Sequence, residues 1–235
     1  MKAAFSRSDI SIDDCAYLNR GRWGNADLYR HLAEGREWVV KDFRCCPPVI
    51  RRLWGSVMVR RELRALRRLD GIRGIPRYAF RLDAYALCYQ YMPGATLAEA
   101  DPGRTPPEFF ETLEKMVRQM HSRGICHLDI RYRRNILVLS DGLPGLIDFQ
   151  SHLDVSRLPA VLRRWLEQAD LSGVYKHWCV RWPGTLTADR LQLLRSADRR
   201  RGMWIFKGYG LRLKPRKKRN YGPAVDKERE REGAF

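Results

Sequence analysis

The order in which strand and helix patterns occur along the chain constrains its fold more than any other feature. A strand, a glycine turn and a second strand fit residues 17–30, the β-branched stretch 37–43 predicts another strand, and two more are expected within 77–92. From residue 105 onward, apolar residues recur mostly at helical spacing. Strands followed by helices favour an α+β fold with segregated parts. We therefore expect two lobes with a cleft between them.

Capping residues suggest where the later helices begin and end. Thr105 and Glu108 have the spacing of a capping box, and Gly124 suits the left-handed position after a helix. A hairpin with its turn at "SDGLPG" should separate this helix from a second helical region that begins near residue 156, and Thr187 is expected to cap a later helix. The buried stripe of the first of these helices should comprise Phe109, Phe110, Leu113, Met116, Val117 and Met120.

The chain is strongly basic. Its 235 residues include 45 lysines and arginines against 27 acids, a formal net charge of +18. Such an excess raises affinity for phosphates, nucleic acids and anionic membrane surfaces without selecting one of them. The basic residues are concentrated in the stretches 51–69 and 212–220, although a basic run is often only a solvated face.

The sequence also bears on the cellular compartment. No apolar run approaches the length that spans a bilayer, and the first residues lack the apolar core of a secretory signal. The six cysteines have no metal-site spacing and are expected to be reduced thiols. We expect a cytoplasmic protein, with peripheral contact at the inner face of the cytoplasmic membrane as an extension of that assignment.

The stretch "HLDIRYRRNILV", residues 127–138, places Asp129 among arginines. Neighbouring cations favour the ionised carboxylate, which can accept a hydrogen bond from a hydroxyl group. An aspartate in such a loop often only caps the backbone. The nearby Asn135 and Asp148, both oxygen ligands suited to Mg²⁺, favour a chemical role instead.

Phosphoryl transfer from ATP needs further parts, and the first half of the chain offers them. Gly21 and Gly24 in "NRGRWG" would let the backbone approach a phosphate. Lys41 lies in the predicted strand "WVVKDF", and Glu62 lies in a predicted helix rich in arginine. Taken singly, such glycines ordinarily mark a turn, such a lysine faces solvent, and such a glutamate forms an ion pair with a nearby arginine. The sharper hypothesis is that Glu62 reaches into the cleft and holds Lys41.

Together, these segments resemble the protein-kinase-like superfamily. Over roughly residues 17–180 the chain is most similar to small bacterial kinases of the lipopolysaccharide-core (Kdo/WaaP) and RIO-like types. The resemblance depends most on "HLDIRYRRNILV" and "LIDFQ". It implies an α+β, protein-kinase-like two-lobe fold without an extended activation segment. The N-lobe would span 1–92 and the C-lobe 93–212, followed by a basic and mixed-charge tail at 213–235.

The resemblance also implies roles for individual residues. Lys41 would contact the α- and β-phosphates of ATP, and Glu62 would orient it. Asp129 would be the catalytic aspartate that positions the acceptor hydroxyl. Asn135 and Asp148 would ligate Mg²⁺.

Three further positions carry implied roles. Gly21 and Gly24 would cover the phosphates, and Arg131 would act beside Asp129 by bringing a cation near the γ-phosphate. His127 is expected to be a packing and hydrogen-bonding residue rather than a base.

The sequence departs from the protein-kinase pattern in several places. Asn19 replaces the first glycine of the glycine-rich loop, and Gln150 stands where many kinases have glycine. The interval from Asp129 to Asn135 is one residue longer than in typical protein kinases, which bears on the metal role of Asn135. No A-P-E motif follows Asp148, which disfavours a phosphorylation-gated docking loop for peptides.

We therefore expect an enzyme, an ATP- and Mg²⁺-dependent kinase that moves the γ-phosphate to an alcohol group. A sugar hydroxyl of the lipopolysaccharide core is the favoured acceptor, because the peptide-docking segment is missing and the chain is basic. A serine or threonine of a protein, as in RIO-like kinases, stays open as the acceptor. A nucleic-acid-binding protein and a pseudokinase on the same fold are further alternatives. The basic segments motivate the first of these, and the presence of Lys41, Asp129 and Asp148 weighs against the second.

Overall fold

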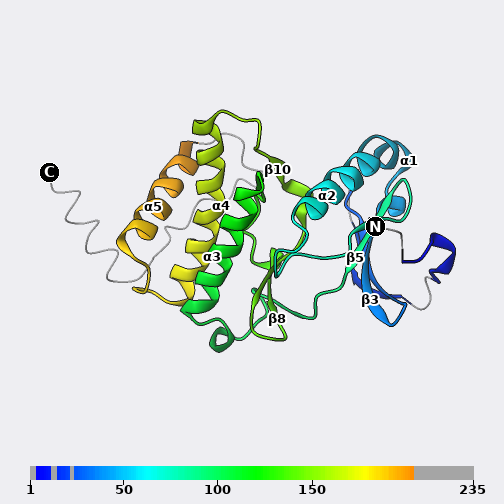
Figure 1. The fold of residues 1–235 in the computed structure, drawn as a ribbon, viewed down its shortest axis with the longest axis horizontal. Helices are drawn as coiled ribbons and strands as arrows, with labels where there is room; N and C mark the ends of the chain where they lie inside the picture. Colours follow the sequence, from blue (N-terminus) through cyan, green and yellow to red (C-terminus); the bar gives the residue numbers. More distant parts are fainter. Residues whose placement is uncertain (1–3, 12–14, 22–23, 204–235) are drawn as a thin grey trace.

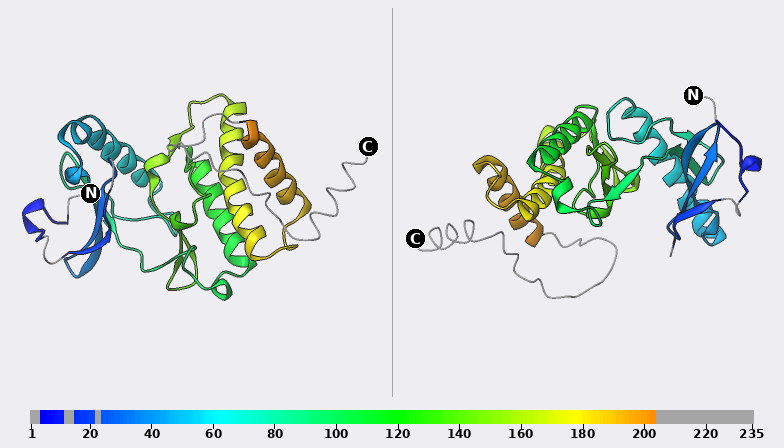
Figure 2. Two further views of the ribbon diagram at one scale, coloured as in Figure 1. Left: turned by 180° about the vertical axis from the view of Figure 1, so that it is seen from behind. Right: turned by 90° about the horizontal axis from the view of Figure 1, so that it is seen from below.

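The protein has an α+β fold with antiparallel strand pairs, and its computed structural model describes residues 4–11, 15–21 and 24–203. Figure 1 shows the strands β3 and β5 with helices α1 and α2 at one end, helices α3, α4 and α5 at the other, and β8 between them. Figure 2 shows the same separation from behind and from below. The expected tail, 213–235, and the basic run 212–220 lie outside the described residues.

The first part is built on a five-stranded antiparallel sheet with the order β1-β2-β3-β5-β4. The strand predictions for this part are confirmed, including the pair expected within 77–92. Lys41 lies near the end of β3, where it pairs with Leu28 of β2 and Leu87 of β5. The strand bounds are β1 Ala16–Asn19, β2 Asp27–Ala33, β3 Arg36–Asp42, β4 Phe80–Arg81 and β5 Ala86–Gln90.

Helix α2 (Ser56–Arg68) covers one face of this sheet and contacts β4 and β5. It continues from the single turn α1 (Pro48–Ile50) through a π-helical turn, Arg51–Gly55. The two faces of α2 differ, because all of its apolar residues except Val57 are buried while most of its arginines face outward. The opposite face of the sheet is covered by the N-terminal segment, where Phe5 packs edge-on against Trp38 and Phe80.

The second part consists of helices α3 (Pro107–Ser122), α4 (Ala160–Arg181) and α5 (Ala188–Met203), with α4 packed between the other two. The apolar stripe expected for α3 is confirmed, since all six of its residues are buried. Gly124 follows the end of α3 with φ +73°, as the sequence predicted.

The capping box expected at the start of α3 is wrong. The helix begins at Pro107, and the residue before it, Pro106, makes no side-chain cap. Thr105 is fully buried, and its hydroxyl donates to the Pro102 carbonyl at 3.0 Å. A residue that precedes proline is pushed toward extended backbone, so Thr105 stays outside the helix and Glu108 has no partner there.

Two small sheets connect the parts and position the segments that the sequence singled out. One has the order β6-β8-β9, with β6 Gly94–Thr96, β8 Ile136–Leu139 and β9 Pro144–Leu146. The other pairs β7 (Ile125–Cys126) with β10 (Leu153–Asp154). The loop 127–135 therefore lies between β7 and β8, and Asp148 follows β9. Short 3₁₀ turns occur at Arg7–Asp9, Phe43–Cys45, Pro102–Arg104, Arg133–Asn135 and Phe149–Ser151.

None of the helices within the described part of the chain combines the length and the apolar character needed to cross a membrane.

Candidate functional site

The amine of Lys41 lies between two carboxylates. Its Nζ is 2.8 Å from Oε2 of Glu62 on α2 and 2.8 Å from Oδ1 of Asp148 after β9. The Lys41 side chain is 4% exposed. Burial lowers the pKa of Lys41, but the attraction of the two carboxylates outweighs burial and holds this pKa above its usual value. The predicted Lys41–Glu62 ion pair is therefore present, and the amine is charged.

The two acids differ in their access to solvent. The Glu62 side chain is 1% exposed, and burial raises its pKa although the Lys41 charge offsets part of that rise. The Asp148 side chain is 46% exposed, and the charge of Lys41 lowers its pKa. Asp148 is thus an ionised carboxylate that a solute can reach, whereas Glu62 serves Lys41 from the interior.

Helix α2, which carries Glu62, is tied to the short segment that follows Asp148. The Arg61 guanidinium donates to the His152 carbonyl at 2.7 Å. About two helical turns further along α2, Arg68 forms an ion pair with Asp154 of β10 at 2.8 Å. These contacts fix the distance between the helix glutamate and the aspartate that share Lys41.

The backbone at the start of the loop 127–135 is hydrogen-bonded to Asp170 of α4. One oxygen of this carboxylate accepts the His127 N–H and the other accepts the Leu128 N–H, both at 2.7 Å. The same carboxylate also bonds the His121 imidazole at 3.1 Å. Asp170 is 1% exposed, so without these donors its burial would be costly. Sequence reasoning missed this residue, whose signal is a lone acid in the apolar helical stretch "ADLSGV".

Asn135 holds the carboxylate of Asp129. Its Nδ2 donates to Asp129 Oδ2 at 2.8 Å and to the Asp129 carbonyl at 3.2 Å. Asn135 is buried, while Asp129 is partly exposed. The loop ends in the 3₁₀ turn Arg133–Asn135, and Asn135 contacts Asp129 across the six-residue interval between them.

Asp148 is placed beside this loop by the backbone of the residue before it. The Ile147 N–H donates to the Asn135 carbonyl at 3.0 Å, and the Ile147 carbonyl accepts from His127 Nε2 at 3.1 Å. Both backbone groups of Ile147 are therefore bonded to the loop. Lys41, Glu62 and Asp148 are connected in this way to Asp129 and Asn135.

His127 is a structural residue in this arrangement. Its Nδ1 accepts the Asp129 N–H at 3.3 Å, so that nitrogen is unprotonated and Nε2 carries the hydrogen donated to Ile147. The ring is fully buried and meets Phe149 edge-on at 4.7 Å between centroids. A ring enclosed and hydrogen-bonded in this way orients the backbone at Asp129.

Two residues of the site have backbone conformations that side chains disfavour. Leu128 has φ 65° and Asp148 has φ 64°, and they are two of the four non-glycine residues with positive φ in the described ranges. Such conformations persist only where surrounding contacts impose them, and they are concentrated at functional sites.

The glycine turn between β1 and β2 depends on Gly21. Its N–H donates to Asp27 Oδ1 at 2.7 Å, and a Cβ added there would lie 2.1 Å from the Asn25 carbonyl oxygen. Gly24 has φ +96°. The turn leads into β2, the strand that pairs with β3 beside Lys41. Residues 22 and 23 at its tip are outside the described ranges.

Arg131 is engaged elsewhere. Its guanidinium donates to Ser172 of α4 at 2.9 Å and to Asp198 of α5 at 2.6 Å. Its carbonyl accepts from Lys176 at 3.0 Å. The structure thus places Arg131 against the helices instead of among the contacts of Lys41 and Asp148. Arg131 therefore has a structural role, and its implied role near the γ-phosphate stays a prediction.

The residues that could hold Mg²⁺ have suitable chemistry. Asp148 offers an ionised, accessible carboxylate, and Asn135 uses its Nδ2 on Asp129, which leaves its amide oxygen as an acceptor. Hard oxygen donors of this kind suit Mg²⁺. A second cluster, His121, Cys126 and Asp170, fits a metal less well. Burial raises the pKa of the Cys126 thiol, and the Asp170 oxygens already accept backbone hydrogen bonds.

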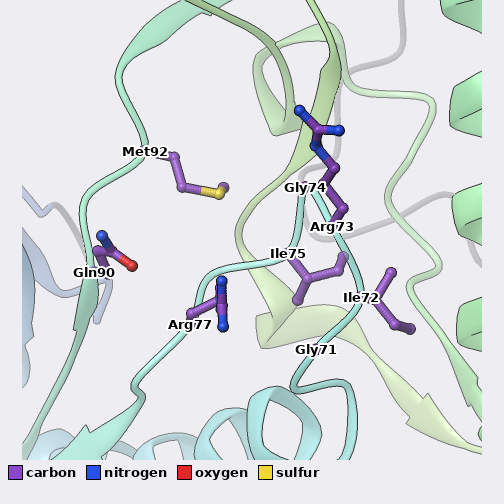
Figure 3. A pocket seen from close by; sticks show the side chains of 8 residues that line it. All are labelled: Gly71, Ile72, Arg73, Gly74, Ile75, Arg77, Gln90 and Met92. Carbon is purple, nitrogen blue, oxygen red and sulfur yellow. The ribbon is translucent and has the colours of Figure 1, made fainter. Parts of the chain in front are cut away.

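A cavity of about 350 Å³ lies where the segment 71–77 passes the end of β5 and the residues that follow it (Figure 3). None of the predicted site residues lines it. Its lining consists of Gly71, Ile72, Arg73, Gly74, Ile75, Arg77, Gln90 and Met92.

Comparison with models of known protein families and comparison with curated proteins both gave no match to this chain.

Proposed function

We propose that the protein is an ATP- and Mg²⁺-dependent phosphotransferase with a protein-kinase-like two-lobe fold. The N-lobe would comprise residues 1–92 and the C-lobe 93–212. The observation that carries this proposal is the buried, charged amine of Lys41 between Glu62 and Asp148, next to the loop in which Asn135 holds Asp129.

Each of these side chains suits one task in phosphoryl transfer. An ammonium group has three donors, so Lys41 can bind a phosphate oxygen while Glu62 continues to hold it. Asp148 and Asn135 would hold Mg²⁺, which when bound neutralises phosphate charge. Asp129, oriented by Asn135, accepts the hydrogen bond of the acceptor hydroxyl and so directs that oxygen at the phosphate.

The favoured acceptor is a sugar hydroxyl of an anionic glycolipid such as the lipopolysaccharide core. The chain returns to β10 within a few residues of Asp148 and pairs there with β7, which leaves little room for an extended peptide-docking segment. The high positive charge favours an anionic acceptor surface. A protein serine or threonine is the second acceptor class.

Transfer of labelled γ-phosphate from ATP tests the enzyme and the acceptor together. Purified full-length protein would be incubated with Mg²⁺ and either a cell-envelope glycolipid fraction or a protein substrate mixture. Asp129→Ala should lower the transfer rate about 100-fold or more while leaving ATP affinity nearly unchanged. Lys41→Met should weaken ATP binding itself. The matched control is Asp189→Ala, which removes an exposed acid at the start of α5.

Several results would count against the proposal. Equal transfer by wild type and Asp129→Ala would remove the role given to Asp129. Wild-type protein whose melting temperature does not rise with ATP and Mg²⁺ would favour a pseudokinase or a nucleic-acid-binding protein. Salt-dependent affinity for RNA or DNA without ATP binding would select the latter.

A further inference from the structure

An exposed apolar stripe runs along the segment that leads into α2. Helical residues are spaced so that positions four apart share a face, and here that face is turned to solvent. Leu53 is 74% exposed and Val49 is 68% exposed, whereas a folded chain normally buries such a run. The apolar stripe consists of Val49, Ile50, Leu53, Trp54 and Val57.

Positive charge continues from this stripe along α2. Four exposed arginines on the same segment form no ion pair with any described residue: Arg52, Arg60, Arg64 and Arg67. Between residues 43 and 69 the sequence contains a single acid, Glu62, and that acid is buried against Lys41. The outward face of the segment therefore presents apolar side chains and cations without a carboxylate.

The start of α4 has the same character. Val161 is 83% exposed and Leu162 is 41% exposed. The exposed arginines Arg157, Arg163 and Arg164 lie beside them, and among the described residues only Arg163 forms an ion pair, with Glu167 at 3.7 Å. In Figure 1, α1 and the start of α4 both lie along the upper edge of the molecule.

We propose that this edge, formed by the apolar stripe and the start of α4, docks on the surface of an anionic lipid bilayer. Apolar side chains would enter the boundary between headgroups and acyl chains, and the flanking arginines would pair with lipid phosphates. Docking would bring a lipid-linked acceptor to the protein, and that consequence rests on the proposed function. The docking itself does not depend on phosphoryl transfer.

Other occupants fit these surfaces less well. A second copy of the chain packed in a symmetric dimer would bring the same arginines face to face, which is repulsive. A nucleic acid duplex would offer phosphates to Arg60 and Arg64 but no apolar surface to Leu53 or Val49. An anionic bilayer satisfies both kinds of side chain at once.

Vesicle binding by the full-length protein tests the proposal. Cosedimentation would be measured with vesicles of phosphatidylcholine alone and of phosphatidylcholine mixed with phosphatidylglycerol. Wild type should bind the mixed vesicles, less at high salt, and should bind the neutral vesicles weakly. Leu53→Glu and Val161→Glu should each lower the partition coefficient roughly tenfold, because each replaces an inserted apolar group with an acid.

Matched controls separate the docking edge from a general effect of added acid. Leu32→Glu on β2 changes a side chain that is 69% exposed, and Val180→Glu changes one that is 60% exposed at the opposite end of α4. Both controls should stay within about twofold of wild type, because a single distant charge contributes little through salt. All variants keep the basic run 212–220, so their differences report on the edge alone.

The proposal is overturned if wild type does not bind mixed vesicles. It is also overturned if Leu53→Glu and Val161→Glu bind as well as the controls, which would assign the affinity to another part of the chain. If Leu53→Glu instead converts a dimer to a monomer in solution without changing vesicle binding, a second copy covers the stripe. These readouts use no ATP, so they stand even if the protein transfers no phosphate.

Discussion

Replacing Asp170 with asparagine should loosen the loop that carries Asp129. The two carboxylate oxygens accept the backbone N–H groups of His127 and Leu128, each at 2.7 Å. An asparagine side chain has one acceptor oxygen, and its NH₂ group would face the second N–H donor. One buried donor is then left without an acceptor.

The size of the loss follows from these two bonds. A buried N–H without a partner costs about 1–3 kcal/mol, and the remaining bond loses its charge-assisted part, about 1 kcal/mol more. The expected loss of unfolding free energy is about 2–4 kcal/mol, a large share of the 5–15 kcal/mol typical of a folded protein. With a urea dependence of about 2–3 kcal/mol per molar, the unfolding midpoint should fall by about 1 M.

Urea unfolding followed by tryptophan fluorescence measures this shift, and hydrogen exchange at the His127 and Leu128 amides locates it. The control Asp189→Asn makes the same chemical change at an exposed position of α5. The transfer rate of the Asp170 variant should also fall, since the loop geometry is no longer imposed. Equal midpoints for the two variants, with unchanged protection of both amides, would refute the anchoring role of Asp170.

Three further predictions address other parts of the molecule. Burial lowers the pKa of His177 to about 3, so between about pH 6.5 and pH 3 the unfolded chain binds a proton at this residue and the folded chain does not. As the pH falls through this range, wild type should lose up to about 1.4 kcal/mol of unfolding free energy per pH unit more than His177→Gln. Parallel pH profiles of the unfolding free energy for the two proteins would contradict this. Gly21→Ala should destabilise the protein by about 1–3 kcal/mol, because the new Cβ would lie 2.1 Å from a backbone oxygen, whereas Gly103→Ala, with its nearest atom at 3.4 Å, should change urea unfolding little. A double-mutant cycle on Arg131 and Asp198, both replaced by alanine, should give a coupling of about 1 kcal/mol in urea unfolding, and zero coupling would argue against the helix-docking role of Arg131.

Much of the fold could be predicted because it is specified locally. The apolar stripe of α3, the glycine at its end and the hairpin β8–β9 each follow from residues close together in the sequence. The pair Lys41 and Glu62 was predictable only as a hypothesis. Its residues are 21 positions apart in the sequence. The burial that distinguishes this ion pair from a solvent-exposed one cannot be deduced from the sequence.

The features that sequence reasoning missed depend on distant contacts. Asp170 meets residues more than 40 positions earlier, and nothing near it in the sequence identifies its partners. Arg131 lies two residues after Asp129 in the stretch "HLDIRYRRNILV", yet its guanidinium is bonded to Ser172 and Asp198. Val161 and Leu162 have helical apolar spacing but are exposed, because periodicity gives the face of a helix and not what covers it.

The contacts of Arg61 with His152 and of Arg68 with Asp154 have a consequence for regulation. They join α2 to the strand that follows Asp148, so this helix cannot swing outward without breaking bonds at two places. These contacts favour the arrangement in which Glu62 holds Lys41. For the phosphotransferase proposed above, output would then be governed by where the protein is held and by the supply of its acceptor, rather than by a covalent on–off signal.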